Sequence, residues 1–412
     1  MKFMCNVEDL NKALQSVKKI MDITKQQPYV LMQATGSVLA VCYCDGSHAY
    51  MEKATASIEV EGNVVVEFEN LLRVVNSALP TATLSVNPLE VEVVEGIINI
   101  NVEKCISDGD LGGKVASSMQ HQLQAENVSK NPNKYGVLTR LDYFGLVEDN
   151  GVAEWDIWDK QEFKETIQLA MPGDKEDRES TIYFSSKDKE VKVRGNLYVG
   201  IVKAPTIEKS PFALRVNEAV AFSDVISKFP GSDVYIHTSE DRKFTRIKNS
   251  EDSAVLWFEV APSKRIDGKI FDMYSVAEIA DIQMRVHKGA LEGVISSIIA
   301  TTKDKEHNLK IIHTEDGYAL SLAVSVGGGS MKMDMKTTIE SLRCRENILP
   351  ENYSASLDIK TLKDIIDKCK YEWLSISLAQ EDKVMRVVDV EIVNEDGQLT
   401  PVEVSRFYMT LA

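Results

Sequence analysis

The sequence lacks the features of a membrane-spanning or disulfide-stabilised protein. Its 412 residues contain no apolar run approaching the roughly 18 residues that a membrane-spanning helix needs. The N-terminus has no basic stretch followed by an apolar segment, so we expect no signal peptide. The six cysteines are scattered and no CxxC pair occurs, which argues against a disulfide framework. We therefore expect a cytoplasmic protein.

The motifs of common enzyme classes are also missing. No HExxH or GxSxG is present. The two glycine-rich stretches, DGDLGGK at 108–114 and GGGS at 327–330, both lack the GxxxxGK[ST] form that binds phosphate. Cys42, Cys44 and His48 could be zinc ligands, but a fourth ligand is missing and buried free thiols are the simpler interpretation. We predict no catalytic residue, metal or cofactor. Because Asp and Glu are abundant, a carboxylate-metal nuclease stays open as an alternative.

Positive charge is in deficit. The 47 Lys and Arg face 63 Asp and Glu, which gives a formal net charge of −16. A protein that grips nucleic acid over its whole surface is basic. The composition argues against that class and leaves room for a local basic surface.

What the sequence does contain is a repeated change of hydrophobic period. Phe3, Cys5 and Val7 alternate as in a half-buried strand, and a helical stripe follows at once at Leu10, Leu14 and Val17. The same change recurs near residues 63 and 354, and looser copies begin near 153, 211 and 281. Short strand-like runs follow the copies at 29–32, 83–86, 181–184, 233–236, 309–312 and 373–376. The pattern predicts six β–α–β–β–β units.

This ratio of helices to strands predicts an α+β protein. One helix for every three or four strands indicates antiparallel sheets with helices confined to one face, not a parallel α/β fold. Residues 107–134 are polar and patternless, and they predict an inserted loop (about 106–135). Two units per domain give three domains, at 1–150, 151–276 and 277–412.

Several stretches also fall in the register of a known family. Three of them are the strand–turn–strand at 193–205, FDMY at 271–274 and FYMTLA at the end. The fourth is a group near the N-terminus that consists of Lys2, Phe3, Glu8, Leu10, Lys12, Leu14, Gln15, Val17 and Pro28. On these residues the chain resembles the bacterial-type sliding clamps, the beta subunits of DNA polymerase III. The departures from the family suggest a phage or plasmid version, which would act in the host cytoplasm.

The resemblance implies a non-enzymatic processivity factor. In such a protein, two three-domain subunits close into a homodimeric ring with helices lining a central channel and antiparallel sheets outside. The ring encircles double-stranded DNA without sequence specificity and tethers the replicative DNA polymerase after a clamp loader has placed it. A trimer of two-domain subunits is disfavoured, because six units already fill half of a twelve-helix ring. A scaffold built from the same repeats that binds no DNA is the remaining alternative.

A ring threaded by DNA needs basic side chains on its inner helices. The candidates are Lys12, Lys18, Lys19, Lys25, Arg73, Lys160, Lys164, Lys228, Lys288, Lys303, Lys360, Lys363 and Lys370. Lysine suits this role because it is a flexible point charge that permits sliding. Lysine on an exposed helix face is also ordinary for solubility, so the prediction concerns the set.

The resemblance also implies a groove between the middle and last domains that binds partly apolar peptides of the polymerase and the loader. The matching positions are Gly195, Asn196, Leu197, Tyr198, Tyr274, Val276, Phe407, Tyr408, Met409, Thr410 and Leu411. A lining of methionine and aromatic side chains can adapt to several partners. The same residues could instead be the core of a terminal strand.

Overall fold

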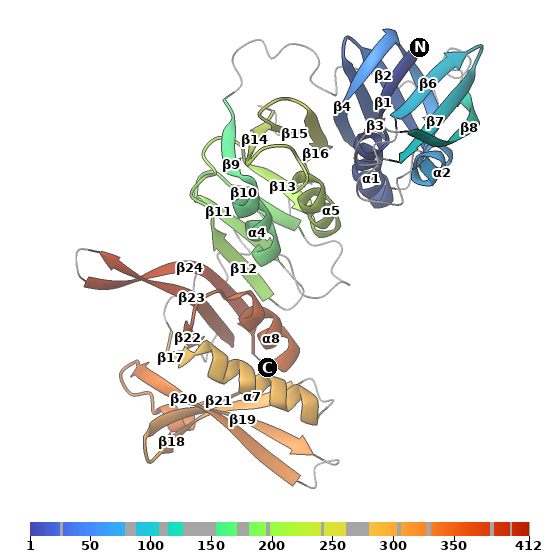
Figure 1. The fold of residues 1–412 in the computed structure, drawn as a ribbon. Helices are drawn as coiled ribbons and strands as arrows, with labels where there is room; N and C mark the ends of the chain where they lie inside the picture. Colours follow the sequence, from blue (N-terminus) through green and yellow to red (C-terminus); the bar gives the residue numbers. More distant parts are fainter. Residues whose placement is uncertain are drawn as a thin grey trace. The chain divides into compact units, whose positions relative to one another are not determined.

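Six β–α–β–β–β repeats can be traced in the described part of the chain, with starts close to those predicted (Figure 1). The predicted strand at 83–86 lies outside the described residues. The computed structural model describes residues 1–24, 28–78, 88–106, 114–126, 154–170, 181–194, 198–239, 243–260, 280–302, 306–326, 331–379, 383–395 and 398–411. Within these residues each repeat contributes one helix and four strands, and every strand pairing is antiparallel. The predicted fold class is therefore confirmed.

The repeats have similar element lengths. The first two comprise β1 (Lys2–Asn6), α1 (Val7–Thr24), β2 (Tyr29–Thr35), β3 (Val38–Cys44), β4 (His48–Val60), β5 (Gly62–Glu67), α2 (Phe68–Ala78), β6 (Pro88–Val94), β7 (Ile97–Ile106) and β8 (Lys114–Glu126). The middle two comprise β9 (Asp156–Asp159), α4 (Lys160–Ala170), β10 (Thr181–Ser185), β11 (Glu190–Arg194), β12 (Tyr198–Lys203), β13 (Phe212–Arg215), α5 (Val216–Ile226), β14 (Asp233–Thr238), β15 (Phe244–Asn249) and β16 (Ala254–Glu259). The last two comprise β17 (Ile282–His287), α7 (Lys288–Thr301), β18 (Glu306–Thr314), β19 (Gly317–Val326), β20 (Met331–Cys344), β21 (Ser354–Asp358), α8 (Ile359–Lys368), β22 (Trp373–Ala379), β23 (Val384–Glu395) and β24 (Gln398–Thr410). A short 3₁₀ turn (Pro350–Asn352) precedes β21.

Polar caps explain why strand turns into helix within one residue. Asp358 ends β21, and its Oδ1 accepts from Thr361 N at 2.7 Å. Asp159 does the same at the start of α4, and His287 Nδ1 accepts from Ala290 N before α7. Each cap satisfies a backbone N–H that the first helical turn leaves without an intrahelical acceptor.

The helical stripes predicted from spacing form the core. Leu10, Leu14 and Val17 of α1 are 0% exposed, as are Leu362 and Ile366 of α8. Burying a leucine side chain of this kind stabilises a fold by roughly 1.5–3 kcal/mol. In Figure 1, α1 packs beside α2 and α7 beside α8, each pair over its own strands.

The repeats interlock in pairs by exchanging their first strands. Strand β1 pairs with β6 and β5 with β2, so each of the first two repeats completes the sheet of the other. The same exchange joins β9 to β14 and β13 to β10, and again β17 to β22 and β21 to β18. In the first and last pairs of repeats this exchange accompanies contact between the two helices, α1 with α2 and α7 with α8.

Two compact units contain these strands, residues Met1–Lys164 with Val220–Val260 and residues Glu165–Ala219 with Ala261–Ala412. The first holds a sheet in the order β1-β6-β7-β8-β5-β2-β3-β4-β16-β15-β14-β9, which is closed over its first eight strands because β1 also pairs with β4. The second holds β13-β10-β11-β12-β24-β23-β22-β17-β20-β19-β18-β21. The division into three domains stays a prediction.

The predicted insertion at 107–134 is wrong over 114–126. These residues form β8, which pairs with β7. Gln120, Gln122 and Gln124 are exposed and alternate with the half-buried Met119 and Leu123. A glutamine face conceals the period of two when only the polarity of the segment is considered. Residues 107–113 and 127–134 lie outside the described residues.

Candidate functional site

The candidate basic residues lie mainly on or just beside the helices. Lys12, Lys18 and Lys19 are on α1, Arg73 is on α2, and Lys160 and Lys164 are on α4. Lys288 opens α7, and Lys360 and Lys363 are on α8. Lys228 and Lys370 were predicted on helices but follow the ends of α5 and α8, so that prediction is wrong for both. Lys25 and Lys303 lie outside the described residues.

Two of the candidate lysines are engaged by the backbone. Lys160 Nζ donates to the carbonyls of Phe229 and Gly231, each at 2.8 Å, just past the end of α5. Lys288 Nζ donates to Cys369 O, where α8 ends. In both cases the first residue of one helix satisfies carbonyls beyond the end of another helix, where intrahelical donors are missing. These two contacts stabilise the fold.

Four more candidates form ion pairs. Lys12 approaches Glu52 at 3.5 Å, and Lys19 contacts Asp224 of α5. Lys363 pairs with Asp367 at 2.6 Å, and Lys370 pairs with Glu165 at 2.7 Å. All four ammonium groups remain partly exposed to solvent. The carboxylates reduce the positive field that these lysines present.

Five candidates have no ion pair within the described part of the chain, namely Lys18, Arg73, Lys164, Lys228 and Lys360. Arg73, Lys228 and Lys360 are exposed, and Lys18 and Lys164 are half-buried. Their charges are available to an anionic partner. Helix spacing alone did not separate them from the engaged lysines.

The predicted partner groove brings together two segments that are far apart in the sequence. Tyr198 of β12 lies directly opposite Met409 of β24, and Val199 lies opposite Tyr408. Phe407, Met409 and Leu411 are buried. Tyr408 is 2% exposed and packs with Val199, Ile201 and Val384. The chain end is thus a core strand, which is the simpler of the two interpretations of the sequence. Gly195, Asn196, Leu197, Tyr274 and Val276 lie outside the described residues, and nothing is described of the Tyr198 and Thr410 side chains.

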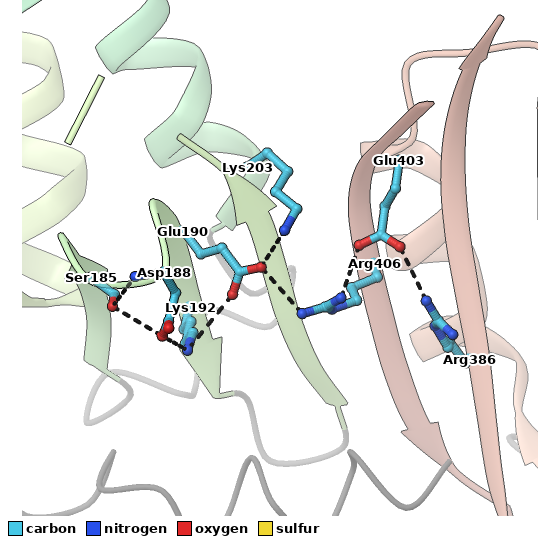
Figure 2. Close-up of polar contacts among 8 residues, drawn as sticks. All are labelled: Ser185, Asp188, Glu190, Lys192, Lys203, Arg386, Glu403 and Arg406. Atoms are coloured by element: carbon cyan, nitrogen blue, oxygen red, sulfur yellow. Dashed lines mark hydrogen bonds and ion pairs between the residues drawn. The ribbon is translucent and has the colours of Figure 1, made fainter. Parts of the chain in front are cut away.

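A polar network missed by sequence reasoning crosses the same pair of strands (Figure 2). The carboxylate of Glu190 accepts from Lys203 at 2.5 Å and from Arg406 at 3.2 Å. Arg406 also donates to Glu403, which accepts from Arg386 at 3.1 Å. At the other end Lys192 donates to Asp188 and lowers the pKa of that carboxyl group. Opposite charges two residues apart on β11 (Glu190, Lys192) and three apart on β24 (Glu403, Arg406) were the available signal.

The two cysteines considered as zinc ligands are buried thiols. Cys42 and Cys44 are both 0% exposed, and burial raises the pKa of Cys42 to about 12. Among the described residues, no cluster of three or more His, Cys, Asp or Glu side chains could hold a metal ion. In the same part of the chain no helix has the length and apolar character needed to cross a bilayer.

Comparison with known proteins identifies the fold. No family model matches the chain and no curated protein sequence is similar to it. Solved structures match over its full length: the DNA polymerase III subunit beta of Pseudomonas aeruginosa at 13% identity with a TM-score of 0.70, and the Caulobacter crescentus pol III beta at 13% with 0.69. The chain covers 100% of both. The beta subunit from the Streptococcus pyogenes DNA polymerase matches at 10% identity and 0.64, again with 100% of each chain covered.

The chain has the sliding-clamp fold. The predicted resemblance is thereby confirmed for the fold, and the low identity shows how far the sequence has diverged. A sliding-clamp fold accounts for the interlocked repeats.

Proposed function

We propose that the protein is a DNA polymerase processivity factor that acts as a homodimeric ring of six domains. The observation that supports this proposal is the match to bacterial sliding clamps over the full length of both chains, together with the six repeats that the described residues form. A shared fold alone does not require a shared function. The match does fit a protein whose work is to hold DNA and other proteins, with no chemistry of its own.

The DNA-facing surface in this proposal consists of the candidate basic residues that form no ion pair with another described residue. Lys18, Arg73, Lys164, Lys228 and Lys360 can neutralise phosphates, with support from the exposed ion-paired lysines. The net charge of −16 repels DNA from most of the protein surface. Local basic groups are then the favourable place for a duplex.

The peptide-binding surface in this proposal lies where β12 and β24 meet. Tyr198 lies opposite Met409 in the register of these strands, and the buried Tyr408, Met409 and Leu411 side chains support the site from beneath. Leu411 N donates to Lys383 O at 2.6 Å, which holds the chain end beside β23. Polymerase and loader peptides with apolar side chains are the proposed ligands.

Two measurements test the proposal. Light scattering should give 92 kDa, twice the chain mass of 46.0 kDa. The second measurement is retention on circular DNA. Protein that has been diluted to monomer is concentrated in the presence of a circular plasmid, so that rings close around the DNA. Gel filtration should then show protein retained on the circle and released when one restriction cut linearises it.

The outcomes separate the alternatives. A chain that stays at 46.0 kDa with and without DNA contradicts the ring. A dimer that is never retained on the circle indicates a scaffold without DNA, and degradation of the plasmid indicates a nuclease. Retention that survives linearisation indicates ordinary DNA binding.

A further inference from the structure

We propose that the sheet face opposite α7 and α8 carries a second docking groove, for a short peptide with acidic residues around an apolar anchor. The groove has a volume of about 620 Å³ and crosses β20, β17, β22, β23 and β24. Its lining residues all belong to one compact unit. It shares no residue with the predicted partner groove, so its test is independent of the proposed function.

Small side chains in the middle of the sheet create the hollow. Arg285 of β17 lies between Ser341 of β20 and Ser375 of β22 in the antiparallel register. Ser377, two residues further along β22, lines the groove as well. Side chains of neighbouring residues in a strand alternate between faces. Trp373, Ser375 and Ser377 therefore share one face of β22, and all three line the groove.

Larger side chains form the walls. Trp373 stands at one end, with the Arg285 guanidinium 4.7 Å from its ring centroid. Val388, Val390 and Ile392 follow one another on the same face of β23, and Pro401 pairs opposite Ile392. Ile392 is 38% exposed, so this apolar wall remains accessible. An aliphatic or aromatic side chain of a ligand can be buried against it, which is how peptide anchors gain affinity.

The groove is electropositive in a strongly acidic protein. Its lining contains Arg285, Arg343 and Arg386 against the carboxylate of Glu403, a balance of +2, whereas the chain carries −16. Arg285 also pairs at 3.2 Å with Glu340, which lies outside the lining, so Arg343 supplies the uncompensated charge. Arg343 is exposed and has no ion pair among the described residues. Arg386 donates to Glu403 at 3.1 Å, and its buried Nε has no acceptor among the described residues. These groups are suited to carboxylates of a ligand.

The same features favour a peptide over single-stranded DNA. Single-strand sites depend on aromatic platforms that stack successive bases. Here the lining has one aromatic residue, Trp373, and Arg285 covers a face of it. The apolar wall from Val388 to Ile392 offers phosphates no partner, whereas it can hold an apolar side chain of a peptide. The volume lies within the roughly 300–1,000 Å³ of small-ligand pockets, which suits a few side chains of an extended peptide.

The test selects peptides from a random twelve-residue phage library on the full-length protein. Enriched peptides should combine Asp or Glu with a central aliphatic or aromatic residue. One enriched peptide, labelled with fluorescein, is then titrated by anisotropy against wild type, Arg343→Glu and Ile392→Glu, the latter at the 38% exposed end of the apolar wall. Both variants should bind the peptide more than about ten-fold more weakly. The first repels the carboxylates of the peptide, and the second places a charge in the wall that holds its apolar side chain. Arg343 is exposed, so its replacement leaves the fold intact.

The matched control is Lys310→Glu, which reverses an exposed charge on β18, away from the groove. It should bind the peptide as wild type does. Basic or purely polar enriched peptides overturn the proposal, as does a peptide whose affinity is unchanged by Arg343→Glu. The proposal is also overturned if a labelled twenty-nucleotide oligothymidine binds more tightly than the peptide and the same two variants abolish that binding, because the groove would then be a nucleic-acid site.

Discussion

Arg406 donates to the carboxylate of Glu190 across 216 residues of sequence, with 3.2 Å between Nη2 and Oε1 (Figure 2). The Glu190 side chain is only 5% exposed and also accepts from Lys203. Strands β11 and β12 are thereby tied to the C-terminal strand β24. Because β12 and β24 also pair through their backbones, this seam depends on both hydrogen bonding and charge.

Removing the carboxylate at this seam should destabilise the protein. Glu190→Ala leaves Lys203 and Arg406 without their shared acceptor, and breaking a buried ion pair from one side costs about 3 kcal/mol. Urea unfolding measures the loss. The control is Glu208→Ala, whose carboxylate is 58% exposed and pairs with Lys189 at 3.1 Å. It should cost less than about 1 kcal/mol. Equal effects of the two variants would show that burial of Glu190 is unimportant.

A glycine at the same seam has no room for a side chain. A Cβ on Gly200 would lie 2.9 Å from Val193 Cγ1 and 3.1 Å from Phe407 Cδ1. Gly200→Ala should therefore destabilise the protein by about 1–3 kcal/mol through overpacking. The double variant Gly200→Ala with Phe407→Leu should recover part of that loss. If Gly200→Ala is neutral in thermal unfolding, β24 is not packed against β12 as described.

Two lysines of one helix should have opposite phenotypes. Lys160→Met removes two hydrogen bonds to carbonyls beyond α5 and should cost about 1–3 kcal/mol in urea unfolding without weakening DNA binding. Lys164→Met should leave stability unchanged. It should also lower the slope of log affinity for linear duplex DNA against log salt by about 0.9, the value for one lost phosphate contact. The reverse pattern would contradict the assignment of the two lysines.

Sequence patterns predicted the elements well and the roles of polar side chains poorly. The starts of the six repeats were predictable because each changes from a strand period to a helical period, and several carry a polar cap, as at Asp358 before α8. The β8 strand was missed because its exposed face is glutamine. The engagement of Lys160 and Lys288 was not predictable, because their acceptors lie on helix ends 69 and 81 residues away. Local spacing carries no information about such contacts.

The pH dependence of stability should depend on Lys368, near the end of α8. Burial lowers the pKa of Lys368 to about 8 against the opposing attraction of Asp364. In the unfolded chain its pKa returns to 10.5, so between these values the unfolded state binds more protons. Stability should therefore rise with pH from about 8 upwards, by about 1–3 kcal/mol in total. Lys368→Met should remove this rise and stabilise the protein at pH 7.

The buried thiols limit the pH range over which the effect of Lys368 can be measured. Burial raises the pKa of Cys5 to about 12 from 9.0, and raises that of Cys369 as well. Raised thiol pKa values contribute stability that is lost as pH increases above 9.0, which opposes the effect of Lys368. Urea unfolding is therefore compared between pH 7 and 9, where the difference between wild type and Lys368→Met isolates the lysine. Lys363→Met on the same helix, which removes the pair with Asp367, should keep the rise. A rise that persists in Lys368→Met would place its origin elsewhere.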